Sequence, residues 1–366
     1  MAAADHEFMA QALKLAAFGM FTTTPNPRVG CVLVREGRVV GEGWHQRAGE
    51  PHAEIHALLR AGDLARGATA YVTLEPCSHF GRTPPCSRAL IDAGVSRVVA
   101  AMEDPNPQVA GRGFALLRQA GIEVEVGVLE MEARELNIGF VSRMTRGRPW
   151  LRVKVATSLD GRTALANGQS QWITGAAARQ DGHRWRARAC AILTGIGTVR
   201  DDNPQLTVRG VDTVRQPLKI VVDSKLELSP QARVFDGGAV LVATACEEMR
   251  RAEILRERGG EILFLPNADG KVDLPALMET LAHRGINEVH VEGGSRLSGA
   301  LIDARLVDEL LLYMAPCLLG GDARGAFDCA PLASLNDKVS LSLRDVRMIG
   351  GDLRLLARVV HRQATA

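Results

Sequence analysis

The chain has 366 residues, of which 46% are hydrophobic and 23% charged, and its 44 basic and 42 acidic residues leave a formal net charge of +2. This length allows two domains, while the near-neutral charge and an aromatic content of only 4% argue against nucleic acid or a membrane as partner. Seven scattered cysteines indicate reduced thiols, and Met1 to His6 contains no long apolar run. We therefore expect a cytoplasmic enzyme without a signal peptide or membrane span.

Helix and strand patterns alternate from residue 8 to residue 128. The apolar spacing predicts helices at 8–20, 52–61, 85–93 and 113–120, and strands at 29–35, 38–44, 70–74, 97–102 and 124–128. A turn at Glu36-Gly37 would join the first two strands as a hairpin, and a glycine directly follows each of the last three helices. Strands interleaved with helices predict a layered α/β domain.

A basic stretch that contains glycine and proline, Arg143 to Pro149, interrupts this pattern. We expect the interdomain linker there, with a first domain over residues 1–146 and a second over 147–366. The second domain has predicted strands at 151–156, 191–194, 220–223, 239–243, 261–265, 288–292 and 309–315, and helices at 247–258 and 274–283. It is therefore expected to be a second α/β domain with one core.

The most informative motif is His52-Ala53-Glu54, followed by Cys77 and Cys86. One imidazole and two thiolates make three ligands, which is the set of a catalytic zinc whose fourth position stays open for water. Such a zinc lowers the pKa of the water, and a carboxylate at Glu54 could shuttle its proton. The pattern therefore predicts a hydrolytic deaminase.

A structural zinc site is the alternative, in which His79 would supply a fourth protein ligand. That reading leaves the position of Glu54 without a purpose. Eight residues separate the two cysteines, whereas zinc deaminases of nucleosides and nucleic acids usually have two. This loop places His79 and Arg82 beside the metal, and an arginine can hold a phosphate through two hydrogen bonds. The loop thus points to a small phosphorylated substrate.

The run PCSHFGRTPPC at 76–86 resembles the signature of the bifunctional riboflavin-biosynthesis deaminase/reductase family, as do segments 24–31, 41–45 and 103–107. The resemblance implies zinc ligands at His52, Cys77 and Cys86 and a proton donor at Glu54. It also implies contacts with the pyrimidine and its ribose phosphate from Asn26, His45, His79 and Asn106. Arg82 stands where the family commonly has lysine, so the charge is kept while the geometry differs.

The second half has no phosphate-binding Walker loop, and the run Gly195 to Arg200 lacks the third glycine of a Rossmann motif. The run Glu292 to Gly299 instead follows an apolar strand and precedes a helical pattern. Glycines there would let backbone N–H groups approach a phosphate at the helix N-terminus, although an ordinary strand-to-helix turn would have the same pattern.

Segments 154–164, 170–175 and 197–209 resemble the reductase domain of the same family, which is similar in fold to dihydrofolate reductase and uses NADPH. By position, the resemblance implies that the cofactor is held by Ala156, Trp172, Thr198, Asp202, Gly294, Ser295, Arg296, Leu297, Ser298, Gly299 and Ala300. It implies that the substrate is held by Ser170, Arg186, Leu206, Arg209 and Glu292. The resemblance weakens after about Arg324.

The family resemblance implies a cytidine-deaminase-like α/β/α domain followed by a dihydrofolate-reductase-like α/β domain. It implies zinc-dependent deamination of 2,5-diamino-6-(5-phosphoribosylamino)pyrimidin-4(3H)-one, a cyclic amidine, and then reduction of the ribosyl group to ribityl by NADPH. Asp202 and Lys154 both stay open as proton donors of the second step. The expected partners are the phosphoribosylated pyrimidine and further copies of the chain in a dimer or tetramer. A zinc deaminase acting on tRNA or single-stranded nucleic acid, and a non-catalytic zinc-stabilised scaffold, are the alternatives.

Overall fold

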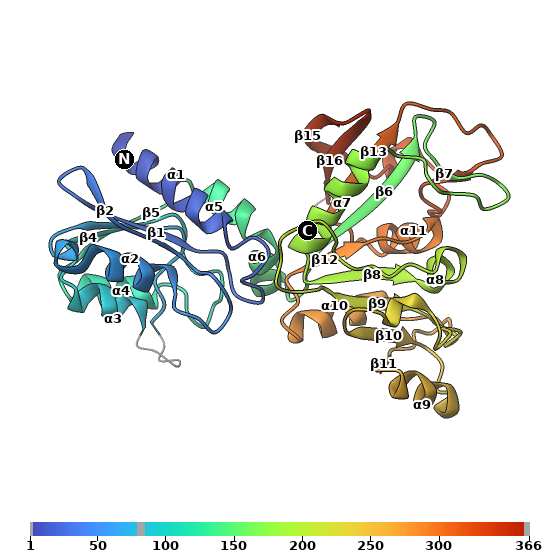
Figure 1. Cartoon of the computed structure of the whole chain (residues 1–366), viewed down its shortest axis with the longest axis horizontal. Helices are drawn as coiled ribbons and strands as arrows, with labels where there is room; N and C mark the ends of the chain where they lie inside the picture. The colour runs from blue at the N-terminus through green and yellow to red at the C-terminus, as the bar shows by residue number, and fades with distance from the viewer. Residues whose placement is uncertain (1–2, 79–84, 362–366) are drawn as a thin grey trace. The chain divides into compact units, whose positions relative to one another are not determined.

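The computed structural model describes residues 3–78 and 85–361 (Figure 1). The chain forms two compact units, Met1–Arg148 and Pro149–Ala366, so the division lies two residues after the predicted one. No helix among the described residues is long and apolar enough to cross a membrane.

The first unit is built on a five-stranded sheet in the order β2-β1-β3-β4-β5. Its strands are β1 (Gly30–Arg35), β2 (Arg38–Trp44), β3 (Thr69–Val72), β4 (Arg97–Ala100) and β5 (Glu123–Val126). The helices are α1 (Ala3–Ala17), α2 (Ala53–Ala61), α3 (Cys86–Asp92), α4 (Arg112–Gln119), α5 (Glu130–Leu136) and α6 (Ile138–Arg146), with a 3-10 turn at Gly62–Ala65. The hairpin of β1 and β2 is antiparallel, as is the pair β1 and β3, while β3, β4 and β5 run parallel.

Side-chain alternation along the strands places one helical layer on each face of this sheet. On β1, Cys31 and Leu33 belong to the core beneath α2, α3 and α4. Val32 and Val34 belong to the opposite core, beneath α1, α5 and α6. Figure 1 shows the two helical layers on either side of the strands. This confirms the predicted α/β/α layering.

Helix α2 lies unusually close to β2, because two strand residues that face it are glycines. A Cβ at Gly41 would come within 2.2 Å of the carbonyl oxygen of Ala57, and a Cβ at Gly43 within 2.3 Å of that of Ala53. Larger side chains would therefore push the helix away. This close packing fixes the start of α2, where His52 and Glu54 lie.

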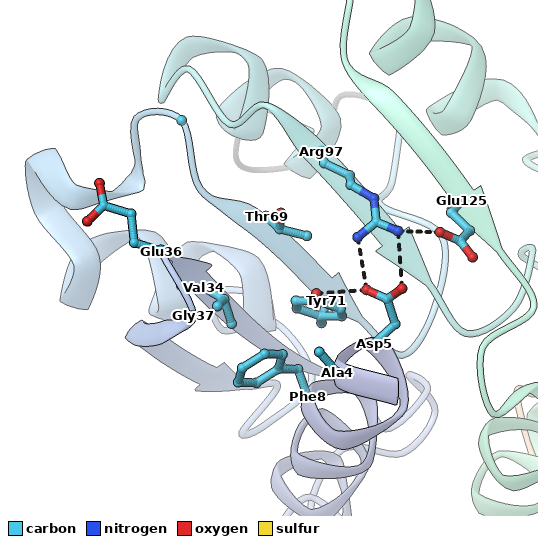
Figure 2. Close-up of a pocket in the computed structure, with 11 residues that line it drawn as sticks. Ala4, Asp5, Phe8, Val34, Glu36, Gly37, Thr69, Tyr71, Arg97 and Glu125 are labelled. Carbon is cyan, nitrogen blue, oxygen red and sulfur yellow. Dashed lines mark hydrogen bonds and ion pairs between the residues drawn. The ribbon is translucent and has the colours of Figure 1, made fainter. Parts of the chain in front are cut away.

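A partly buried ionic network, drawn in Figure 2, ties α1 to the three parallel strands. Asp5 of α1 accepts hydrogen bonds from Arg97 of β4 and from the Tyr71 hydroxyl of β3, both at 2.9 Å. The Arg97 guanidinium also bonds Glu125 of β5. The helix accordingly begins at Ala3 and ends at Ala17, earlier at both ends than the predicted 8–20.

The predicted linker is wrong over its first four residues. Arg143 to Arg146 are the last turn of α6, which ends at Gly147 in the left-handed conformation (φ 66°). Phe140, Val141 and Met144 supply the apolar face of this helix and pack into the core beneath α1. The charged residues that suggested a linker belong to the more exposed side of a helix.

The second unit contains a nine-stranded sheet in the order β11-β10-β9-β8-β12-β6-β13-β16-β15. The strands are β6 (Trp150–Ser158), β8 (Ala191–Gly195), β9 (Leu218–Val222), β10 (Val240–Thr244), β11 (Gly260–Phe264), β12 (Glu288–Val291), β13 (Glu309–Ala315), β15 (Leu341–Ile349) and β16 (Asp352–Val359). The short strands β7 (Arg162–Ala164) and β14 (Arg324–Gly325) pair separately, and 3-10 turns lie at Arg233–Phe235 and Leu335–Asp337. All neighbours from β11 to β13 are parallel, whereas β16 and β15 complete the sheet antiparallel.

The helices of this unit are α7 (Ala176–Arg188), α8 (Ile196–Asp202), α9 (Met249–Glu257), α10 (Leu274–His283) and α11 (Ser295–Asp303). The chain moves from β8 outward to β11, and then returns to place β12 between β8 and β6. In open parallel sheets a ligand crevice forms at the carboxyl ends of strands where the direction of strand order reverses. The loops after β8 and β12 lie at that point.

Candidate active sites

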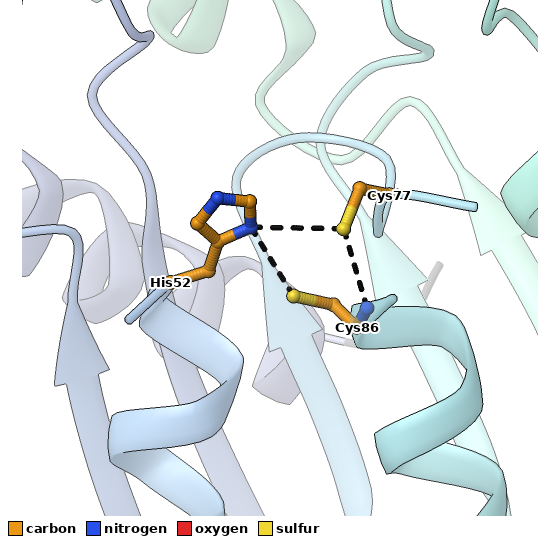
Figure 3. A group of neighbouring side chains, drawn as sticks. All are labelled: His52, Cys77 and Cys86. Carbon is orange, nitrogen blue, oxygen red and sulfur yellow. Dashed lines mark hydrogen bonds between the residues drawn. The ribbon is translucent and has the colours of Figure 1, made fainter. Parts of the chain in front are cut away.

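Three potential metal ligands meet in the first unit at the ends of three different elements (Figure 3). His52 precedes α2, Cys77 follows β3, and Cys86 is the first residue of α3. The Nδ1 atom of His52 lies 3.6 Å from Sγ of Cys77 and 3.3 Å from Sγ of Cys86, and the three ligand atoms all lie within 4.8 Å of one another. One nitrogen and two sulfurs at this spacing suit a tetrahedral zinc with one position left for water.

The electrostatics of the thiols also fit a metal. The backbone N–H of Cys86 donates to Sγ of Cys77 at 3.2 Å. Hydrogen bonds from the Cys86 thiol and from His52 lower the pKa of Cys77 to about 4, against the opposing effect of burial. The same hydrogen bond and burial raise the pKa of Cys86. One thiolate is thus already favoured before a cation arrives.

Glu54 lies in the first turn of α2, two residues after His52, and is only 3% exposed. Burial, together with the nearby Cys77 thiolate, raises its pKa to about 7. Its Oε2 atom is buried and has no hydrogen-bond partner among the described residues. A buried carboxylate oxygen without a partner beside three soft ligands fits a site that handles a metal-activated water.

Asn26 and His45 lie beside this centre. The His45 ring packs edge-on against the His52 ring, with 5.3 Å between the centroids. Its Nδ1 lies 3.2 Å from the carbonyl oxygen of Pro51, and its Nε2 lies 3.1 Å from Nδ2 of Asn26. Because a carbonyl can only accept, Nδ1 carries the proton and Nε2 accepts from Asn26. This orients the Asn26 amide and leaves its oxygen available to a ligand.

Asn106 belongs to a turn that is held by Glu75, a residue that the sequence reasoning missed. The Asn106 side chain accepts from the backbone N–H of Gln108 at 3.1 Å. Glu75 is 4% exposed and accepts from the backbone N–H groups of Asp104, Gly111 and Gly113 at 3.1, 2.9 and 2.8 Å. The available signal was an acidic residue directly before Pro76-Cys77. The predicted ligand-contacting residues His79 and Arg82 lie outside the described residues.

The second unit has a cavity of about 1570 Å³ at the carboxyl ends of β6, β8, β9 and β12. Many of the predicted cofactor and substrate residues line it: Ala156, Ser170, Thr198, Asp202, Glu292, Gly294, Ser295, Arg296, Leu297 and Ala300. Helix α11 begins here without a side-chain cap, so its first N–H groups can donate hydrogen bonds to an anion. Ser295 and Arg296, the first residues of this helix, both line the cavity. The size and these donors fit a dinucleotide.

Lys154 and Glu292 are charged residues of this cavity wall, whereas Arg186, also predicted to hold the substrate, does not line the cavity and contacts it through Glu292. Arg186 and Glu292 form a two-pronged ion pair, one bond of which measures 2.9 Å, and Arg186 also donates to the carbonyl of Thr207 at 3.0 Å. Burial opposes ionisation of Glu292, but Arg186 and Lys154 lower its pKa overall. Burial lowers the pKa of Lys154, which lines the cavity. Because Arg186 and Glu292 are already paired with each other, they can form hydrogen bonds with polar substrate groups without leaving an unpaired charge in the free enzyme.

His290 is a second residue that the sequence reasoning missed. It is fully buried on β12, and neither ring nitrogen has a hydrogen-bond partner among the described residues. Its Nε2 lies 3.6 Å from Glu292. Burial lowers its pKa to about 3, so the ring is neutral at ordinary pH. A single histidine in an apolar strand carried no sequence signal that distinguished it from a core residue.

Several predicted residues of this site lie elsewhere than on the described cavity wall. Trp172 is 70% exposed and stacks with Arg179, and the backbone N–H of Arg209 donates to His183 at 3.2 Å. The Leu206 side chain packs in the core beside β9 and β10, so only its backbone can face a ligand. Ser298 and Gly299 are buried, and a Cβ at Gly299 would come within 2.0 Å of the carbonyl oxygen of Asp328.

Comparisons with known proteins assign each unit to a known domain. Residues 2–102 match the family described as the cytidine and deoxycytidylate deaminase zinc-binding region, and residues 149–355 match the RibD C-terminal domain. The riboflavin biosynthesis protein RibD of Escherichia coli is 51% identical over 365 residues, covering 96% of this chain and 98% of that protein. The protein of the same name from Haemophilus influenzae is 47% identical, covering 96% of both chains.

Solved structures agree along the whole chain. The Acinetobacter baumannii RibD structure has a TM-score of 0.91 at 44% identity, covering 98% of this chain and 99% of that one. A Thermotoga maritima structure, named as a diaminohydroxyphosphoribosylaminopyrimidine deaminase/5-amino-6-(5-phosphoribosylamino)uracil reductase, has a TM-score of 0.87 at 34% identity, with coverage of 98% and 99%. Both units are therefore shared with the same two-domain proteins.

Proposed function

The chain belongs to the RibD family of riboflavin-biosynthesis proteins, and from this premise we propose that its two units act in turn on one phosphoribosylated pyrimidine. It is a bifunctional enzyme, with a zinc-dependent deaminase unit and an NADPH-dependent reductase unit. The first substrate would be 2,5-diamino-6-(5-phosphoribosylamino)pyrimidin-4(3H)-one, in keeping with the name that the Thermotoga maritima relative carries. A nucleic-acid deaminase and a non-catalytic scaffold are not favoured.

The observation that carries the deaminase proposal is the set of His52, Cys77 and Cys86 beside the buried, unpartnered oxygen of Glu54. When bound there, zinc would supply a water of lowered pKa. Glu54 would take a proton from this water and return it to the departing ammonia. Asn26, oriented by His45, would contact the pyrimidine ring. His79, Arg82 and Asn106 are proposed to complete the contacts with the substrate.

In the reductase unit, NADPH would supply a hydride to the opened ribose. We assign the substrate contacts to Ser170, Arg186, Leu206, Arg209 and Glu292. The cofactor contacts are Ala156, Trp172, Thr198, Asp202 and the segment 294–300. Support comes from the cavity, which ten of these residues line, and from the uncapped start of α11 at its middle. Arg186 and Glu292 would hold the sugar phosphate chain between fixed, oppositely charged groups.

The decisive experiment incubates the purified protein with the diaminopyrimidine phosphate and follows ammonia and NADPH absorbance together. Ammonia should appear without NADPH, and NADPH should be oxidised only after ammonia has been released. Oxidation of NADPH with no prior ammonia release would overturn this order. Absence of ammonia from a zinc-loaded sample would overturn the deaminase assignment.

We also propose that the enzyme works as a homo-oligomer in the cytoplasm, where its seven free cysteines would stay reduced. Support for assembly comes from one face of β15, an edge strand of the nine-stranded sheet. Four apolar residues on this face, Leu341, Leu343, Val346 and Met348, are 43–63% exposed. These four residues pair with one face of β16, while Asp345 and Arg347 take the other. An apolar face on a terminal strand favours association, and a two-fold pairing of identical faces is the commonest solution.

Sedimentation velocity tests this assembly. The wild-type chain should sediment as a dimer or larger, and Leu343→Glu with Met348→Glu should shift it toward the monomer. Met131→Glu is the matched control, because Met131 is 77% exposed on α5 of the other unit. A monomeric wild-type protein, or an equal effect of the control, would contradict the assignment to β15.

A further inference from the structure

The reductase cavity extends beyond every residue assigned so far. Its wall continues past the end of β9, with Ser224 and Lys225, and includes the turn before α10, with Asp269 and Lys271. The family resemblance assigned none of these residues to the cofactor. This extension contains two lysines, which raises the question of which anionic group they would bind.

The order of the chemical groups along a nicotinamide dinucleotide indicates which group would occupy this end of the cavity. The inner end has Lys154, Ala156 and Glu292, where the reducing ring must meet the substrate. The middle has the start of α11 at Gly294 and Ser295, which suits the pyrophosphate. In the sheet β9 lies beyond β8, on the far side from β12 and β6, so the end of the cavity at β9 would receive the adenosine ribose. The only chemical difference between NADPH and NADH is a phosphate on the 2′ oxygen of that ribose.

Hydrogen bonds fix the two backbone segments that carry the lysines at this end. The backbone N–H of Val272 donates to Oγ of Ser224 at 3.1 Å, which joins the turn before α10 to the end of β9. Within that turn, Oδ1 of Asn267 accepts from the backbone N–H groups of Asp269 and Lys271 at 3.0 and 2.8 Å. Lys225 directly follows Ser224, and Lys271 directly precedes Val272. The hydrogen bond therefore brings the two lysine positions to neighbouring parts of the wall.

The charges at this end favour a phosphate only through these lysines. Both lysines are exposed, and neither forms an ion pair among the described residues. Glu227 and Asp269 line the same end and would repel a phosphate, which carries between one and two negative charges near pH 7. Arg296 lies at the start of α11, beside the expected pyrophosphate. Discrimination between NADPH and NADH therefore requires that attraction of the phosphate by the two ammonium groups exceed its repulsion by the two carboxylates.

We propose that Lys225 and Lys271 bind the 2′-phosphate of NADPH and are the residues that select NADPH over NADH. The inference rests on the proposed function, because it requires a dinucleotide in this cavity. Each lysine contributes a charge-assisted hydrogen bond, so its removal should weaken binding of the phosphate roughly tenfold. Binding of the same nucleotide without the 2′-phosphate should not change, or should improve slightly as a cation is lost.

The test measures binding of small fragments to the full-length protein by calorimetry, so that it needs no turnover. The probes are 2′,5′-ADP, which carries the 2′-phosphate, and 5′-AMP, which does not. Lys225→Gln and Lys271→Gln should each weaken 2′,5′-ADP roughly tenfold and leave 5′-AMP unchanged, while the two Lys→Arg variants should retain most of the affinity. Lys338→Gln is the control, because Lys338 lies outside this cavity.

The outcomes separate the inference from the function beneath it. If wild-type protein prefers 2′,5′-ADP to 5′-AMP and the lysine variants keep that preference, the assignment of Lys225 and Lys271 is overturned while the cofactor site stands. Loss of the preference in Arg296→Gln alone would place the 2′-phosphate at α11 instead. If wild-type protein binds neither NADP+ nor 2′,5′-ADP, the proposed function fails together with the inference.

Discussion

The two active sites solve the problem of buried charge in opposite ways. In the deaminase unit, three ligand atoms lie within 4.8 Å of one another and the buried Glu54 oxygen has no partner among the described residues. In the reductase unit, Glu292 is partly buried, with its side chain 16% exposed, and is held by Arg186 on both oxygens. The first site needs a cation from outside to become complete, whereas the second has neutralised its own charges within the fold.

This difference predicts different responses to substitution. A small metal site depends on each of its few members, so the loss of one should remove most of the activity. The reductase cavity, of about 1570 Å³, distributes its contacts over many strands and loops. Single changes there should have graded effects, except where they leave one member of a buried ion pair alone.

The largest expected effect comes from Glu54→Gln in the deaminase unit. Removing the proton shuttle should lower the rate of ammonia release by about 10² to 10⁴-fold. Zinc content should stay near that of the wild type, since Glu54 is not one of the three ligands. Ammonia assays and metal analysis by mass spectrometry measure both quantities.

This variant has two controls, of which one removes a zinc ligand and the other measures the reductase activity. His52→Ala should lose both zinc and ammonia release, and the reductase unit of both variants should still oxidise NADPH when given the deaminated substrate. Ammonia release that survives in a zinc-loaded Glu54→Gln protein would refute the proton shuttle. Loss of the reductase activity as well would refute the independence of the two sites.

A smaller effect is expected from the ion pair in the reductase unit. Arg186→Met leaves the partly buried Glu292 without its main partner, which should cost less than the loss of about 3–5 kcal/mol that breaking a fully buried ion pair causes. The double variant Arg186→Met/Glu292→Gln should recover part of that stability, although reductase activity should stay low in both. Urea unfolding and NADPH oxidation measure the two effects. Equal stability of the single and double variants would show that the pair is not coupled.

A region can be predicted from the sequence when the interactions that form it join residues close together in the chain. Helix α10 has the predicted bounds because its signals are local: Asp273 caps the backbone N–H of Ala276, and Pro275 lies in its first turn. The metal ligands were similarly predictable, since they are the ends of short elements within a few dozen residues. The structure brings the ligand atoms of these three residues to within 4.8 Å of one another.

The remaining features depend on contacts between distant parts of the chain. Arg186 and Glu292 are 106 residues apart, and nothing near either one identifies its partner. Glu75 is likewise defined by backbone groups 29 to 38 residues later. The strands β15 and β16 were missed in part because a register shift between Leu343 and Asp345 interrupts the alternation of apolar residues along β15. The place of β16 in the sheet is set by its pairing with β13, and that of β15 by its pairing with β16, and not by local pattern.

The smallest expected effect concerns His290, a titratable side chain that is buried without a hydrogen-bond partner among the described residues. It faces Glu292, Arg152, Arg186 and Lys154, and burial holds its pKa at about 3, below the ordinary value of about 6.5. The folded protein therefore keeps the ring neutral while the unfolded chain takes up a proton as the pH falls below about 6.5. This contribution to stability is present above that pH and is lost, at up to about 1.4 kcal/mol per pH unit, toward pH 3. Between pH 7 and 5, His290→Gln should flatten the fall in protection of the β12 amides against hydrogen exchange, and His283→Gln, at an exposed position on α10, should not. An unchanged slope in His290→Gln would mean that the ring gains a partner when it is protonated.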